Sequence, residues 1–157
     1  MFRGTILLID RFSRMNTLIN SYLSASGFVV KCMRSVDDLR TVRLNTIHLA
    51  LLDIDTAGGR LKEILEQMKS AGGPVIVLTS ESDHAGRLSA LELGAADVMS
   101  RPLDIAELVA RIRAAQARTQ VSVTGFDRPP VSFGGLTVDI SKYRAELDGE
   151  PLNISPK

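Results

Sequence analysis

Four polar motifs stand out because each lies where a short apolar run ends. They are Asp10-Arg11, Asp53-Ile54-Asp55, Thr79-Ser80 and Arg101-Pro102. A carboxylate that faces a hydroxyl and a cation has the groups that aspartyl phosphorylation needs. The carboxylate attacks a phosphoryl group, while the hydroxyl and the cation bind its oxygens. The residues therefore indicate a phosphoryl-transfer type of site, provided that the fold brings the four run ends together.

The apolar runs predict a fold that does so. Five of them are expected to be buried strands, at residues 5–10, 28–33, 47–53, 74–79 and 96–100. A helical pattern follows each run, and alternating strands and helices favour a parallel sheet covered on both faces, the doubly wound α/β fold. In such a sheet ligand sites form at the carboxyl ends of the strands.

Apolar spacing predicts which residues of the five helices face the core. In the first, Met15, Leu18, Ile19, Tyr22 and Leu23 share one face; in the third, Leu61, Ile64, Leu65 and Met68; in the fourth, Leu88 and Leu91; in the fifth, Ile105, Leu108, Val109 and Ile112. Ser35 and Asp38 form a capping box for a weaker second helix, and Asp104 is the expected cap of the fifth.

The sequence changes character after Arg118. Residues 119–130 are polar and end in two prolines, which predicts a linker between a first domain at 1–118 and a second element at 131–157. The second element alternates apolar and polar residues, and Asp148-Gly149 is a strong hairpin signal. We expect about four short antiparallel strands.

Composition excludes several classes of protein. The net charge of +1 indicates neither nucleic acid nor membrane as a partner, and 45% apolar residues support a real core. A lone cysteine, Cys32, excludes a disulfide framework and a cysteine-based zinc site; we expect it to be a small core residue. No signal peptide or apolar run of membrane-spanning length is present, so we expect a cytoplasmic protein.

Five motifs together resemble the receiver domains of bacterial response regulators over residues 4–118. They are Ile6-Leu7-Leu8-Ile9-Asp10, Leu51-Leu52-Asp53, Val77-Leu78-Thr79-Ser80, Leu91-Glu92-Leu93-Gly94-Ala95 and Arg101-Pro102-Leu103. Residues 108–113 resemble the last receiver helix of OmpR/PhoB-type regulators. Residues 133–139 and 147–152 resemble the opening sheet of that family's winged-helix DNA-binding domain.

The resemblance assigns a role to each position of the site. It makes Asp53 the phosphoacceptor and Thr79 the hydroxyl that senses the phosphoryl group, and it implies a cis peptide at Arg101-Pro102. Four positions depart from the family pattern. Its Mg²⁺-binding acidic pair is here Asp10-Arg11, its lysine is Arg101, its aromatic switch residue is Val98, and the loop at 55–59 lacks its usual proline.

These departures favour a pseudo-receiver. Mg²⁺ needs hard oxygen ligands, and Arg11 replaces one carboxylate by a cation. We expect no Mg²⁺ and no other cofactor, with Arg11 and Arg101 flanking Asp53 and supplying charge neutralisation without phosphate. The alternative is that Arg11 points to solvent while Asp10, Asp53 and Asp55 still bind a metal.

The resemblance also implies a homodimer through the fourth helix, fifth strand and fifth helix. Arg87–Glu107 and Asp97–Arg111 would pair across it, around an apolar centre that includes Leu91. Glu107 could equally serve a capping box with Asp104.

Three functions remain in competition. The first is a phosphorylation-independent dimerisation module of a transcription regulator, whose intact form binds promoter DNA and RNA polymerase. The second is an ordinary receiver phosphorylated on Asp53 by a histidine kinase, and the third is a flavodoxin-like enzyme. The loop after the first strand, residues 10–14, lacks the phosphate-cradling residues that the enzyme would need. We therefore expect no enzymatic activity, and we expect residues 1–157 alone to bind no operator.

Overall fold

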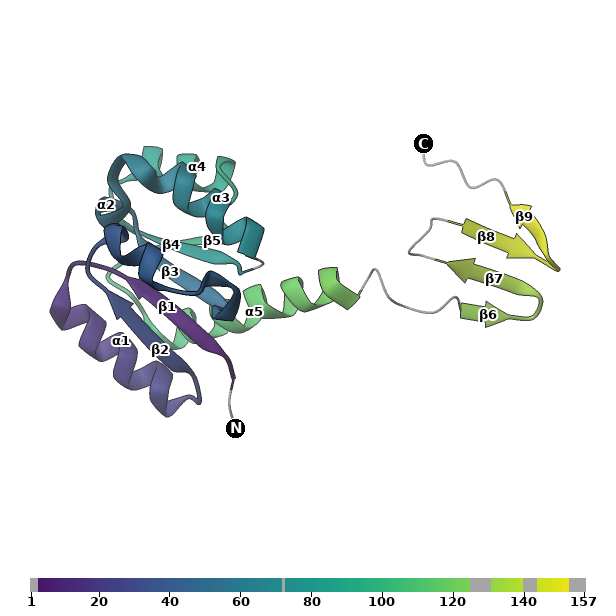
Figure 1. Ribbon diagram of the computed structural model, residues 1–157, viewed down its shortest axis with the longest axis horizontal. Coiled ribbons are helices and arrows are strands. Elements are labelled where there is room, and N and C mark those ends of the chain that lie inside the picture. The colour runs from purple at the N-terminus through teal and green to yellow at the C-terminus, as the bar shows by residue number, and fades with distance from the viewer. Residues whose placement is uncertain (1–2, 72, 125–130, 140–143, 153–157) are drawn as a thin grey trace. The chain divides into compact units, whose positions relative to one another are not determined.

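A computed structural model of the chain describes residues 3–71, 73–124, 131–139 and 144–152 (Figure 1). The chain divides into two units, Met1–Gln116 and Ala117–Lys157. The first contains the sheet whose carboxyl edge carries the polar motifs, and the second contains the predicted short strands.

The sheet of the first unit has five parallel strands in the order β2-β1-β3-β4-β5. They are β1 (Thr5–Ile9), β2 (Val29–Met33), β3 (Leu49–Asp53), β4 (Val75–Ser80) and β5 (Asp97–Arg101). Every strand starts within two residues of its predicted position. The doubly wound α/β fold is confirmed.

Helices cover both faces of this sheet. α1 (Ser13–Ala25) and α5 (Ile105–Thr124) pack on the face that carries Ile6 and Leu8. α2 (Ile54–Ala57), α3 (Leu61–Ala71) and α4 (His84–Glu92) pack on the face that carries Leu7 and Ile9. Alternate residues of each central strand thus enter different cores, because successive strand side chains point to opposite faces.

The predicted inward faces of the third and fifth helices are largely confirmed. Leu61, Ile64, Leu65 and Met68 are buried, as are Leu108, Val109 and Ile112, while Ile105 is partly buried. Asp104 caps α5 by accepting from the backbone N–H groups of Ala106 and Glu107.

In α1 and α4 the prediction was partly wrong. Ile19 and Leu23 are fully buried, but Leu18 and Tyr22 are about half exposed, and so are Leu88 and Leu91. The apolar stripe on each of these helices is wider than the part that packs on the sheet. Helical periodicity predicts where the stripe lies, but it does not predict how much of the stripe is buried.

The second helix was also predicted wrongly. The segment forms two 3₁₀ turns, η1 (Val36–Thr41) and η2 (Leu44–Thr46). The Ser35 hydroxyl accepts from the Asp37 N–H, one residue earlier than in a capping box. Only Val36 and Leu39 of η1 are buried, and their spacing of three fits the three residues per turn of a 3₁₀ helix.

Cys32 is exposed, which corrects its expected place in the core. β2 is an edge strand, and three of its five residues face solvent. The apolar run at 28–33 gave no sign of this, because an edge strand and a central strand can share the same composition.

The second unit is a four-stranded antiparallel sheet in the order β6-β7-β8-β9, as predicted. Its strands are β6 (Val131–Phe133), β7 (Leu136–Asp139), β8 (Arg144–Leu147) and β9 (Glu150–Leu152). Asp148 and Gly149 both have positive φ, 51° and 85°, as a two-residue type I′ hairpin turn requires.

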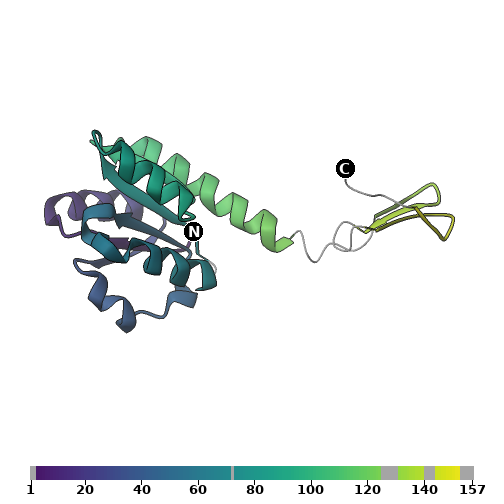
Figure 2. The same ribbon diagram turned by 90° about the horizontal axis from the view of Figure 1, so that it is seen from above.

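The predicted linker at 119–130 begins inside a helix. α5 continues through Thr124, and Figure 2 shows it as one uninterrupted helix. Residues 125–130 lie outside the described residues. No helix in the described part of the chain is long and apolar enough to cross a membrane.

Candidate functional site

The carboxyl edge of the parallel sheet gathers the predicted site residues. Asp10 follows β1, Asp53 ends β3, and Arg101 ends β5. Thr79 lies on β4 one residue beyond Leu78, the register partner of Asp53. Asp10, Asp53 and Thr79 are almost completely buried, and the Arg101 side chain is only 21% exposed. The Arg101-Pro102 peptide is cis, as the resemblance implies.

Arg101 contacts both buried carboxylates with a single nitrogen. Its Nη2 donates to Oδ2 of Asp10 at 2.7 Å and to Oδ1 of Asp53 at 3.2 Å. A guanidinium stays charged and presents several donors in a fixed plane, so it suits a position between two carboxylates. One cation therefore offsets much of the repulsion between two buried acids.

The second oxygen of Asp53 is held by Thr56. Oδ2 accepts from the Thr56 backbone N–H at 2.9 Å and from its hydroxyl at 2.7 Å. Asp53 is thus the N-cap of α2, and the hydroxyl that it binds also accepts from the Arg11 N–H at 3.1 Å. Both carboxylate oxygens of the phosphoacceptor position have donors.

Asp10 is fixed in the same way. Its Oδ1 accepts from the Phe12 N–H at 2.8 Å, and its backbone carbonyl accepts from Nδ2 of the buried Asn16 at 2.6 Å. All four carboxylate oxygens of Asp10 and Asp53 are therefore hydrogen-bonded within the chain.

Arg11 does not flank Asp53, which corrects the prediction. Its guanidinium lies 5.2 Å from the centre of the Phe12 ring, and that of Arg101 lies 5.4 Å from the same ring. Arg11 forms no ion pair with any described carboxylate. A cation–π contact keeps its charge at the surface, where hydration is retained. Asp55 is likewise exposed.

Two buried polar atoms have no hydrogen-bond partner among the described residues: Oγ1 of Thr79 and Oδ1 of Asn16. Buried polar groups are normally paired, so each marks a place where a water or a ligand atom would be favoured. The position of Thr79 at the strand ends makes its hydroxyl available to a group bound beside Asp53.

The site does not fit Mg²⁺. The ion needs several oxygen ligands in octahedral geometry, and the nitrogen of Arg101 already lies against the two carboxylates that could supply them. The described residues contain no group of three His, Cys, Asp or Glu side chains that could hold a metal. A guanidinium at this point repels a divalent cation.

Sequence reasoning missed Thr56, Phe12 and Asn16. Asp is one of the residues preferred at an N-cap, and Asp53 lies directly before the helix α2, so its capping role could have been predicted. Asn16 sits among apolar residues of α1, and this polar residue in an inward position was a signal for a buried hydrogen bond. The place of Phe12 between two arginines had no signal in the sequence.

Comparison with known proteins decides the family. The family of the response regulator receiver domain matches residues 6–113. This chain belongs to the response regulator receiver family. Flavodoxin-like enzymes find no support in this match.

Transcriptional regulators are among its relatives. The chain is 31% identical to TorR, the TorCAD operon transcriptional regulatory protein of Escherichia coli, with 96% of this chain and 67% of that protein covered. It is 28% identical to PhoB, the phosphate regulon transcriptional regulatory protein of Pseudomonas aeruginosa, with 99% and 69% covered. The receiver chain thus spans about two thirds of the length of these relatives.

Solved structures agree on the fold. A crystallised response regulator receiver domain protein of Clostridium thermocellum has a TM-score of 0.67 and 26% identity, over 76% of this chain and 98% of that one. The receiver fold therefore accounts for the first unit.

The receiver's predicted dimer residues lie on α4, β5 and α5. Arg111 donates to both oxygens of Asp97 at 2.9 Å and to Glu107 at 2.7 Å, all within one chain. The hydrogen bonds to Asp97 and then to Glu107 raise the pKa of Arg111 above its ordinary value. Arg87 donates to the Ser100 hydroxyl at 2.7 Å. Pairing across a dimer stays a prediction.

Two apolar side chains of α4, Leu88 and Leu91, belong to this predicted interface and are 60% and 52% exposed. The predicted switch position, Val98, is buried in the core that α3 and α4 cover. A short aliphatic side chain fills that place, where the family pattern has an aromatic ring.

Proposed function

We propose that this receiver regulates transcription as a dimerisation module that does not depend on phosphorylation of Asp53. The observation that carries the proposal is the contact of Arg101 with Asp10 and Asp53. Arg101 takes the place of the family's lysine and contacts both carboxylates, while Arg11 replaces the second acidic residue that would help to hold a metal.

The hydrogen bonds of Asp53 support the same conclusion. A carboxylate attacks phosphorus through an oxygen lone pair, and it must be free to turn toward the incoming group. Here Oδ1 accepts from Arg101, and Oδ2 accepts twice from Thr56. These bonds hold the carboxylate in one orientation, and turning it toward an incoming phosphoryl group would cost hydrogen-bond energy in a buried site.

The poor fit for Mg²⁺ removes the usual means of neutralising a transferred phosphoryl group. Phosphoryl transfer depends mainly on positioning and on electrostatic stabilisation of the developing charge. Arg11 stands at the family's second acidic position and lies over Phe12. Neither it nor Arg101 can replace an oxygen ligand of a metal.

The output would be a homodimer formed by α4, β5 and α5. Leu88 and Leu91 of α4 would form its apolar centre, and Asp97, Glu107 and Arg111 of β5 and α5 would supply its charges. The intact regulator would bind promoter DNA and RNA polymerase through a winged-helix domain, of which the four-stranded sheet at 131–152 is the opening part. The names of TorR and PhoB support this role.

An ordinary receiver is the second candidate, and one observation favours it. The buried Thr79 hydroxyl has no partner among the described residues, and a phosphoryl oxygen on Asp53 would supply one. Phosphorylation by a histidine kinase would then use Oδ1 of Asp53, which accepts one hydrogen bond, from Arg101.

Beryllofluoride, a phosphoryl mimic, separates the two candidates in the presence of Mg²⁺. A ligand at 100 times its Kd stabilises the folded state by about 2.7 kcal/mol, a clear rise in melting temperature. We expect no rise for the natural chain. The triple variant Arg11→Asp, Thr56→Ala, Arg101→Lys is the positive control, because it restores the family's acidic pair and lysine and removes the Thr56 hydroxyl from Asp53. A rise in the natural chain equal to that of the variant would contradict the proposal.

A further inference from the structure

The crossover from β2 to β3 leaves a pocket that no part of the proposed function uses. Two short 3₁₀ turns, η1 and η2, occupy this crossover, and η2 contacts α3. Between them is a cavity of about 460 Å³, within the range of about 300–1,000 Å³ that is typical of small-molecule sites. Its lining residues are Val36, Asp37, Leu39, Arg40, Val42, Leu44, Arg60 and Gln67.

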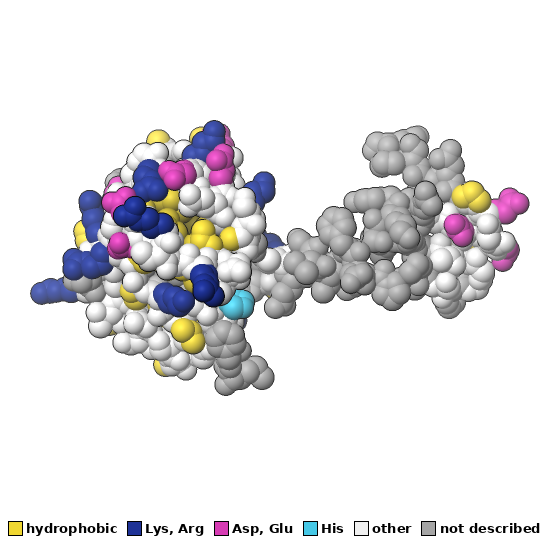
Figure 3. Space-filling view, viewed as in Figure 1, with side chains coloured by type: hydrophobic (Ala, Val, Ile, Leu, Met, Phe, Trp, Pro, Cys, Tyr) yellow, Lys and Arg dark blue, Asp and Glu magenta, His cyan; other side chains and the backbone are white. Residues whose placement is uncertain are grey.

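Half of the residues that line this crossover pocket are apolar, and the other half are polar or charged. Val36 and Leu39 are buried in the core, and Val42 and Leu44 pack against it while remaining partly exposed. Figure 3 shows apolar side chains at the surface on this face, bordered by charged groups. The pocket thus offers apolar contacts beside charged groups, which suits a ligand with both kinds of surface.

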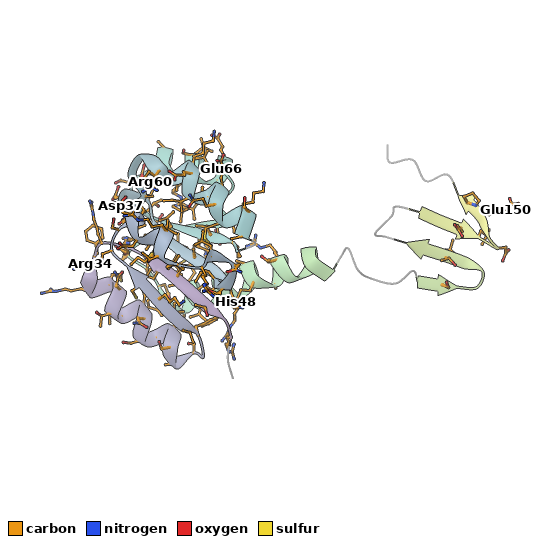
Figure 4. All side chains as sticks on the ribbon, in the orientation of Figure 1. Arg34, Asp37, His48, Arg60, Glu66 and Glu150 are labelled. Atoms are coloured by element: carbon orange, nitrogen blue, oxygen red, sulfur yellow. The ribbon has the colours of Figure 1, made fainter. Side chains whose placement is uncertain are left out.

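Most rim charges are already paired. Arg60 contacts Asp37 at 2.9 Å and Glu63 at 3.1 Å, and Figure 4 shows Arg60 beside Asp37. Gln67 donates to Glu63. The amide of Gln67 and the two acids are therefore engaged with neighbours rather than with the pocket.

Arg40 differs from these residues. Its side chain is exposed, and it forms no ion pair with a described carboxylate. The pocket thus combines four apolar lining residues with one cation that has no ion-pair partner among the described carboxylates. Such a cation at the edge of an apolar surface attracts an anion that brings its own apolar body.

We propose that the crossover pocket binds a small organic anion, with its carboxylate or sulfonate on Arg40 and its apolar body on Val42 and Leu44. This site is separate from Asp53 and does not depend on how the acceptor site works. The chain between them is short, since Arg60 on the pocket rim follows Asp53 by seven residues.

Two matched dyes test the proposal on the full chain. The first, 8-anilino-1-naphthalenesulfonate, is an aromatic anion; the second, N-phenyl-1-naphthylamine, has the same rings without the sulfonate. We expect saturable one-to-one binding of the anionic dye, tighter than that of the neutral dye. Arg40→Glu should weaken only the anionic dye, by about tenfold, the effect of losing one charge-assisted hydrogen bond. Arg43→Glu, the same charge change outside the pocket, should leave both affinities unchanged.

A second pair of variants locates the dye. Leu44→Trp fills the pocket from its wall and should abolish binding, whereas Asn45→Trp, the exposed neighbour, should not. Circular dichroism confirms that each variant is folded. Equal affinity for the two dyes, no response to Arg40→Glu, or full binding to folded Leu44→Trp would each overturn the proposal.

Discussion

The guanidinium of Arg101 lies 2.7 Å from the buried carboxylate of Asp10, although their strands, β5 and β1, are separated in the sheet by β3 and β4. The same nitrogen also contacts the carboxylate of Asp53, which ends β3. One side chain therefore joins three strands at the carboxyl edge of the sheet. In this receiver a permanent internal cation occupies the centre of the site.

Removing this cation should destabilise the fold. Arg101→Ala leaves two buried carboxylates without a counter-charge, and breaking a buried pair in this way costs about 3 kcal/mol. Urea denaturation at neutral pH measures the loss. Arg111→Ala is the matched control, because its partners are more exposed and such pairs contribute at most about 1 kcal/mol. Equal losses in the two variants would mean that Arg101 has no special role.

The Thr56 hydroxyl should contribute to stability through its bonds to Asp53 and Arg11. Thr56→Val keeps the shape of the side chain and removes these bonds, so it should lower the free energy of unfolding by about 1–2 kcal/mol. Thr56→Ser keeps the hydroxyl and should recover most of the loss. If Ser and Val behave alike, the hydroxyl does not hold the acceptor carboxylate.

Mixing two variants reveals whether Asp97 and Arg111 pair across the dimer. Asp97→Arg and Arg111→Glu each place like charges together, so each should weaken self-association by at least about tenfold. If the pair crosses the interface, a mixture of the two variants should form a heterodimer, since opposite charges then meet at both contacts. Sedimentation of each variant and of the mixture measures this.

A different result is expected if Asp97 and Arg111 pair only within one chain. If only the double variant in one chain recovers dimerisation, and the mixture does not, the pair acts within each chain, as it does in the single chain. The apolar centre of the interface can be tested separately, because Leu91→Asp should then abolish dimerisation without touching these charges.

Cys32 should react in the folded protein, but slowly. The thiol is exposed on the edge strand, and partial burial raises its pKa above the ordinary value. The thiolate is the reactive form, so at pH 8 a smaller fraction is available than in a free cysteine, and the rate should rise with pH. Ellman's reagent measures the rate. Labelling that occurs only in denaturant would place Cys32 in the core after all.

Local rules predicted the fold and half of the site. Continuous apolar runs separated by helical patterns determine a parallel sheet, and its carboxyl edge then brings Asp10, Asp53 and Arg101 together. The hairpin at Asp148-Gly149 was predictable because positive φ at both positions favours these residues.

The rest depended on tertiary context. The Arg11 guanidinium lies over the Phe12 ring, where it forms a cation–π contact. The sequence of residues 10–14 does not indicate the direction in which this flexible side chain points. The exposure of Cys32 follows from the edge position of β2, which strand composition does not reveal. The segment after Ser35 forms 3₁₀ turns, and only Val36 and Leu39 of η1 are buried in the core. This limited burial, and the pocket beside the turns, could not be predicted from the local sequence.

Intact-mass measurement after incubation with acetyl phosphate and Mg²⁺ tests the central claim most directly. If Arg101 and Thr56 hold Asp53 through the hydrogen bonds described above, the mass of the natural chain should not change. The triple variant Arg11→Asp, Thr56→Ala, Arg101→Lys should gain one phosphoryl group. Transfer of one phosphoryl group to the natural chain, abolished by Asp53→Asn, would contradict the account and make this an ordinary receiver.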